Sequence, residues 1–155
     1  WDMTIKNWED TILAGREKPD LIIFDPPYFQ KKAADYGENS IARMSRRAYL
    51  HFLDNFFRFL KKTTKETTRL ALINSDWHDF QGCPAFEEET QNAILLTDYY
   101  KILEPAGWEL THIIQAPLSS ERFNAITVSA MQKKKILGVT SRYILMLKQK
   151  TKFGL

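Results

Sequence analysis

Short apolar runs alternate along this chain with longer segments whose apolar positions recur at helical spacing. The apolar runs fall at 21–24, 69–75, 108–116 and 142–149, and polar residues, glycine or proline flank them. Short apolar runs between such breakers are typical of strands buried in a sheet. The pattern therefore predicts four main strands.

Two segments between these runs have the spacing of amphipathic helices. Ser45 is a predicted N-cap, and the helix from 46 to 62 that follows it carries one apolar face: Tyr49, Leu50, Leu53, Phe56, Phe57 and Leu60. A second helix is predicted from about 88 to 103, ended by Pro105 and Gly107. Both helices are expected to lay their apolar faces on the strands.

In three other segments the apolar residues have no regular spacing. Residues 30–44 and 117–141 are polar and uneven, so we expect loops that are the least ordered parts of the molecule, the second with room for a helical segment. In the segment 76–86, Gly82 and Pro84 break any pattern and predict a third loop.

Strands that alternate with helices predict a fold of the α/β class. The expected sheet is mostly parallel, with right-handed crossovers through the helices that cover it. The last two strands are joined without an obvious full helix, which allows a final reversed strand. With 155 residues and no internal repeat, residues 1–155 are expected to form a single domain.

Composition narrows the function classes only slightly. A net charge of +3 and a pI of about 8.9 are compatible with a nucleic-acid partner without identifying one. The single cysteine cannot form an internal disulfide, so we expect a cytoplasmic protein. No apolar run approaches the roughly 20 residues that span a bilayer, which predicts no membrane partner. The chain begins at Trp1 without a methionine, and we expect it to be a piece of a longer protein.

The first strand runs directly into Asp25-Pro26-Pro27-Tyr28, and Phe29 follows. Ligands of open parallel sheets bind at the carboxyl ends of the strands, where Asp25 is expected. Two prolines stiffen the turn and remove two N–H donors, so a carboxylate lies beside carbonyl oxygens with no competing amide. Paired acceptors suit an exocyclic amino group, and the two aromatic side chains suit an aromatic ring. These residues favour recognition of an aromatic amine, such as adenine or cytosine, over a turn that merely ends a strand.

This turn and its surroundings resemble the S-adenosylmethionine-dependent DNA amino methyltransferases, which make N6-methyladenine or N4-methylcytosine. DPPY after an apolar strand resembles their catalytic motif, and NWEDTIL before that strand resembles their acidic turn and short helix. AGWELTHIIQAPL and RYILMLKQ resemble their final two strands, which form a reversed hairpin. The resemblance implies a Rossmann-like methyltransferase fold, S-adenosylmethionine as the cofactor and DNA as the partner, with adenine N6 favoured over cytosine N4.

The resemblance also implies a role for each residue of the motif. Asp25 and the Pro26 carbonyl would hold the target amino group, Pro27 would stiffen the turn, and Tyr28 would stack on a base flipped out of the duplex. Asp25 is not expected to act as a strong general base, because the nitrogen can lose its proton during or after methyl transfer.

Residues outside the motif carry weaker predictions. Phe29, Asn74 and Ser75 are predicted to line the base pocket, although an ordinary capped turn explains 74–77 equally well. Asp10, together with Asp25, is a predicted cofactor contact, and a solvated helix start is the competing interpretation.

Basic residues offer a further set of candidate contacts. The lysine run 133–135, with Arg122 and Arg142, could contact phosphates, and a solvated face is the alternative. No metal is assigned, because no metal-ligand spacing relates the three histidines and the cysteine.

One feature of the family is missing from the sequence. No Gly-x-Gly turn occurs among the six glycines, and in the family a Gly-rich turn after a strand binds the cofactor. We therefore expect the catalytic half of an incomplete methyltransferase fold, whose sheet a dimer or a partner chain would complete. No target-recognition domain is visible.

Two other functions remain open. They are an RNA methyltransferase that acts on a base amino group and a non-catalytic remnant that binds nucleic acid. Restriction–modification is the setting suggested by analogy alone.

Overall fold

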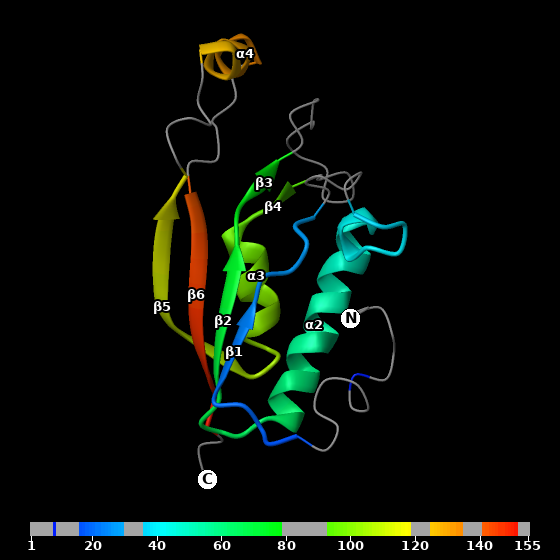
Figure 1. The fold of residues 1–155 in the computed structure, drawn as a ribbon, viewed down its shortest axis with the longest axis vertical. Coiled ribbons are helices and arrows are strands. Elements are labelled where there is room, and N and C mark those ends of the chain that lie inside the picture. The colour runs from blue at the N-terminus through cyan, green and yellow to red at the C-terminus, as the bar shows by residue number, and fades with distance from the viewer. Residues whose placement is uncertain are drawn as a thin grey trace.

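The structure is a computed structural model that describes residues 8, 16–29, 36–78, 93–118, 125–134 and 141–151. The elements follow in the order β1 (Leu21–Phe24), the short 3-10 helix η2 (Ile41–Arg43), α2 (Arg46–Thr63), β2 (Arg69–Asn74), β3 (Trp77–His78), β4 (Ala93–Ile94), α3 (Leu96–Leu103), β5 (Trp108–Pro117), α4 (Ala125–Lys134) and β6 (Ser141–Gln149). Figure 1 shows the main strands side by side, with α4 beyond the end at which β5 stops and β6 starts.

The four predicted strands form one sheet in the order β1-β2-β6-β5. Strands β1 and β2 are parallel, whereas β6 is antiparallel to both of its neighbours, β2 and β5. Three strands therefore point one way and the final strand is reversed, as the sequence predicted, within a mixed α/β fold. The reversed strand lies between β2 and β5, so β1–β2 is the single parallel pair in this sheet. The expected mostly parallel pairing is therefore wrong for the described strands.

Helix α2 supplies most of the core on one face of the sheet. Its N-cap is Ser45, whose hydroxyl accepts a hydrogen bond from the Ala48 N–H, as predicted. The buried side of the helix packs into one apolar cluster with both central strands: Leu53, Phe56, Phe57, Leu60, Leu70, Leu72, Leu145 and Leu147. At the far side of this cluster the buried Trp108 Nε1 donates to the Phe57 carbonyl at 3.0 Å, which joins β5 to α2.

Helix α3 is shorter than the sequence predicted. Residues 93–94, expected to be helical, form β4 and pair antiparallel with β3, so the helix begins at Leu96. Residues 88–92 lie outside the described residues. The predicted end is confirmed, because the helix stops at Leu103 and Gly107 takes a left-handed φ of 92°. An ion pair between Arg46 and Asp98 at 2.9 Å ties the starts of α2 and α3 together.

The predicted loops contain more structure than expected. Residues 41–43 form η2, whose Ile41 and Ala42 are buried, so a uniformly loose loop over 30–44 is wrong for this part. Residues 77–78, also expected in a loop, form β3. The helical segment allowed for within 117–141 is α4. Apolar periodicity could not reveal η2 or β3, because each is too short to establish a period.

The opposite face of the sheet carries exposed apolar side chains. Successive side chains of a strand point to opposite faces, so Ile22 and Phe24 face α2 while Leu21 and Ile23 face away. Leu21 and Ile23 are 49% and 67% exposed, and Ile114 on β5 is 49% exposed. None of the described helices is long and apolar enough to cross a membrane.

Candidate active site

The ends of β1 and β2 bring the predicted site residues to one edge of the sheet. In this parallel pair Phe24 lies opposite Leu72, so Asp25 and Asn74 follow from adjacent strands at the same end. Strand β6 starts at that edge, where Tyr143 pairs with Asn74. The structure therefore gathers the Asp25–Tyr28 turn and the end of β2 at the sheet edge where ligands of open α/β sheets bind.

The side chains of Asp25 and Tyr28 interact within the turn. Asp25 is exposed, whereas Tyr28 is only 9% exposed. Burial, followed by the negative charge of Asp25 and a hydrogen bond with it, raises the pKa of the Tyr28 hydroxyl to about 12. The phenol therefore stays neutral at physiological pH, and the Asp25 carboxylate faces solvent from a stiff support.

The aromatic side of the turn is anchored in the core. The Tyr49 hydroxyl donates to the Pro27 carbonyl at 3.1 Å, and the rings of Phe29 and Tyr49 lie 5.5 Å apart between centroids. Burial raises the pKa of Tyr49 well above its ordinary value. Phe29 is 1% exposed, so it packs in the core beneath the turn.

The three polar residues at the end of β2 and just after it differ in their contacts. Asp76 accepts a hydrogen bond from the Leu96 N–H at 2.7 Å and so caps α3, which is the ordinary capped turn that the sequence also allowed. Asn74 is fully buried, and neither its amide nitrogen nor its amide oxygen has a hydrogen-bond partner among the described residues. Ser75, between them, is 2% exposed. Asn74 is therefore the residue of this segment whose polar groups the described fold leaves unused.

Arg142 reaches the site from a strand that the sequence did not connect with Tyr28. Its guanidinium carbon lies 5.7 Å from the centroid of the Tyr28 ring, a cation–π distance. The sequence suggested Arg142 as a candidate phosphate contact instead. A reversed strand begins at the sheet edge where its neighbours end. The position of Arg142 at the start of the predicted reversed strand could therefore have indicated that it lies near Tyr28.

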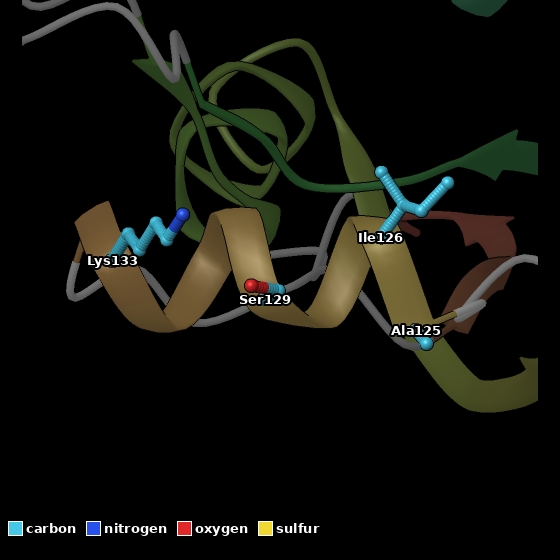
Figure 2. Close-up of a pocket in the computed structure, with 4 residues that line it drawn as sticks. All are labelled: Ala125, Ile126, Ser129 and Lys133. Carbon is cyan, nitrogen blue, oxygen red and sulfur yellow. The ribbon is translucent and has the colours of Figure 1, made fainter.

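Other predicted contacts lie elsewhere. Asp10, Arg122 and Lys135 are outside the described residues. Lys133 is on α4, where it lines a shallow hollow of about 430 Å³ with Ala125, Ile126 and Ser129. Figure 2 shows these four side chains along one helix. The hollow therefore has no wall from the turn that carries Asp25. No cluster of three or more metal-binding side chains occurs in the part of the chain that the structure describes.

Comparison with known proteins gives a structural match and no sequence match. No protein-family model matches the chain, and no curated protein sequence is significantly similar to it. Its fold matches solved structures of TTHA0409 of Thermus thermophilus, described as a putative DNA modification methylase.

The match extends over nearly all of this chain and about half of the other. One structure aligns with a TM-score of 0.58 and 17% identity over 93% of this chain and 52% of that chain. A complex of the same protein with S-adenosyl-L-methionine aligns with a TM-score of 0.56 and 17% identity over 93% of this chain and 51% of that chain. The chain thus shares the fold of about half of these structures.

Proposed function

We propose that this chain is the catalytic half of an S-adenosylmethionine-dependent DNA methyltransferase that acts on the exocyclic amino group of a flipped-out base, with adenine N6 as the favoured target. The observation that carries this proposal is the position of the Asp25–Tyr28 turn. It places the exposed Asp25 at the carboxyl end of β1, and the adjacent strand β2 ends at Asn74, whose amide has no hydrogen-bond partner among the described residues. The methylase structures with the same fold support it.

Asp25 and Asn74 suit a base amino group chemically. The Asp25 carboxylate accepts one N–H of the amino group, which orients the lone pair on nitrogen for attack. The Asn74 amide offers one acceptor and one donor, the complement of an amino group beside a ring nitrogen in adenine and in cytosine. Because both bases present this pair, the preference for adenine is tested by product analysis.

The cofactor would supply an electrophilic methyl group, and this chain alone does not fit it well. No Gly-x-Gly turn occurs in the sequence, and neither described turn glycine, Gly37 nor Gly107, follows a strand. We assign cofactor binding mainly to a second half of the fold, for which the exposed apolar face around Ile23 provides a surface. Calorimetry on residues 1–155 is expected to show weak binding of S-adenosylmethionine or none, and micromolar binding would contradict this division.

The test measures methyl transfer by a protein that contains both this chain and its cofactor-binding half. Unmethylated DNA and RNA of mixed sequence are incubated with labelled cofactor, and the digested nucleosides are separated. We expect N6-methyladenine in DNA. Asp25→Ala should abolish most transfer, since a hydrogen bond to a charged group contributes about 1.5–3 kcal/mol, and Asp25→Asn should be impaired less.

The matched control is Asp54→Ala, which removes an aspartate paired with Arg58 on the surface of α2. It should transfer methyl groups at the wild-type rate. A folded Asp25→Ala protein with near-normal transfer would end the proposed mechanism. Methylation of RNA alone would favour an RNA methyltransferase, and no transfer to either substrate would favour a non-catalytic binding module.

A further inference from the structure

The face of Tyr28 that a base would need is not freely open. Tyr28 is 9% exposed, whereas a stacking platform must offer a ring face to the incoming base. The Arg142 guanidinium lies over this ring, 5.7 Å from its centroid. A base that stacks on this face of Tyr28 therefore has to take the place of Arg142.

The contacts of Arg142 allow such an exchange. Its side chain is half-buried, yet Nε has no hydrogen-bond partner in the described part of the structure. The guanidinium is thus held over Tyr28 while part of its donor capacity is unused. Moving away from the ring would let Nε reach an acceptor that a nucleotide brings with it.

The strengths of the two contacts favour the replacement of Arg142 by a base on Tyr28. A cation–π contact at the protein surface changes a binding equilibrium about 2- to 5-fold. A base stacked on an aromatic ring changes the binding equilibrium about 5- to 150-fold. A phosphate oxygen would also give the displaced guanidinium a charge-assisted hydrogen bond. Replacing arginine by a base on Tyr28 is therefore favourable when the base carries a phosphate.

We propose that Arg142 is a positioning residue that covers the Tyr28 ring before a base binds and, when a base stacks there, turns to the 5′-phosphate of the extruded nucleotide. This inference rests on the proposed base site at Tyr28 and adds a residue to it. It joins two functions in one side chain: the ring stays covered until a base arrives, and a base with its phosphate is preferred to a base without one.

The experiment compares two probes, adenosine and adenosine 5′-monophosphate, titrated into the 155-residue chain and followed by NMR chemical shifts. The wild type should prefer the monophosphate, and added salt should weaken that preference. Arg142→Ala should bind adenosine about 2- to 5-fold more tightly, because the ring is uncovered, and should lose the preference for the monophosphate. Arg142→Lys should keep that preference, because it keeps the positive charge.

Two further variants make the result specific. Arg69→Ala removes an exposed arginine at the opposite end of β2 and should change neither affinity. Tyr28→Ala should weaken both ligands about 5-fold or more. Thermal unfolding of each variant shows that the comparison is made between folded proteins.

The possible failures are distinguishable. If Tyr28→Ala weakens both ligands while Arg142→Ala changes neither, the role of Arg142 is wrong and the base site stands. If Arg142→Ala weakens adenosine, the arginine supports the ring rather than covering it, and the inference is overturned. If the wild-type chain binds neither probe, or Tyr28→Ala has no effect, the base site and this inference are both wrong.

Discussion

Individual polar groups at the edge of the sheet differ in how completely the fold satisfies them. Asp76 caps α3, and the Tyr49 hydroxyl donates to the Pro27 carbonyl. The Asn74 amide, in contrast, is fully buried without a partner among the described residues. A buried polar group left unmatched costs about 1–3 kcal/mol. Asn74 lies at a strand end close to the exposed Asp25. A cost of this kind is expected there if the residue is retained because it binds a ligand.

Asn74→Leu should therefore stabilise the protein while it damages the site. The substitution keeps the approximate size of the side chain and removes the unmatched amide, so we expect a gain of about 1–2 kcal/mol in the free energy of unfolding. Binding of adenosine should weaken in the same variant. Denaturant unfolding and NMR titration provide the two measurements.

The control for this substitution is Asn55→Leu, which replaces an exposed asparagine on α2 that contacts His51. It should change the free energy of unfolding by no more than about 0.5 kcal/mol. A destabilised Asn74→Leu protein would show that the amide has a structural partner, and would remove Asn74 from the proposed site.

Tyr28 gives the stability of the protein a dependence on alkaline pH. Its pKa is raised to about 12 by burial and by Asp25, against about 10 in an unfolded chain. The folded protein therefore holds this proton more tightly, and the resulting stability is complete below about pH 10 and lost as the pH rises through 12. Tyr28→Phe should lose less stability than the wild type across this window, as measured by denaturant unfolding at each pH.

If Tyr28→Phe and the wild type lose stability in parallel between about pH 10 and 12, then burial and Asp25 do not raise the pKa of Tyr28 as described.

At the scale of whole elements, α3 depends on a residue from the end of β2. Asp76→Ala would leave the Leu96 N–H without its acceptor and should cost about 1 kcal/mol, the usual effect of losing a helix cap. Asp76→Asn keeps an acceptor oxygen and should cost much less. Thermal unfolding measures both, and adenosine binding should be unchanged, because the side chain caps α3. Equal stability of Asp76→Ala and the wild type would show that the cap is not needed.

The elements that the sequence predicted well are those with a continuous apolar run or with many apolar residues at one spacing. The four strands and α2 each carry enough apolar positions to fix their type, and Ser45 marks the start of α2 by its own chemistry. The start of α3 was wrong because residues 93–94 pair with β3 instead of continuing the helix. Two residues are too few to establish a strand period.

The candidate site was predictable to the extent that it lies in one local turn. Asp25 and Tyr28 could be predicted as site residues because the motif is continuous in sequence. The contact of Arg142 with Tyr28 was missed because it depends on where the reversed strand inserts. Phe29 was taken for a pocket residue because a local motif does not show which aromatic side chain turns toward the core.

At the scale of the whole molecule, the sheet is covered by α2 and α3 on one face and exposes Leu21, Ile23 and Ile114 on the other. Apolar side chains gathered on one face of a sheet are typical of a surface that packs against another element. The chain also spans about half the length of the structures it matches, at 51–52% of those chains. Both observations support the proposal that a second half of the fold packs here.

Ile23→Lys tests this proposal because its effect should depend on whether that second half is present. In residues 1–155 alone Ile23 is 67% exposed, so lysine should change the free energy of unfolding by no more than about 0.5 kcal/mol and should reduce self-association. In a protein with both halves the same lysine would be buried without a partner, at a cost of several kcal/mol. Denaturant unfolding of both proteins measures the difference.

The matched substitution Ile126→Lys serves as the control, because Ile126 lies on α4 and is 82% exposed. It should be neutral in both proteins, so a loss of stability specific to Ile23→Lys in the larger protein would locate the packing on the open face of the sheet. If Ile23→Lys is equally neutral in both, this face stays in solvent in the larger protein as well. The cofactor-binding half would then have to pair along the outer edge of β1, and Leu21→Pro, which would remove a strand N–H that points away from β2, becomes the next substitution to measure.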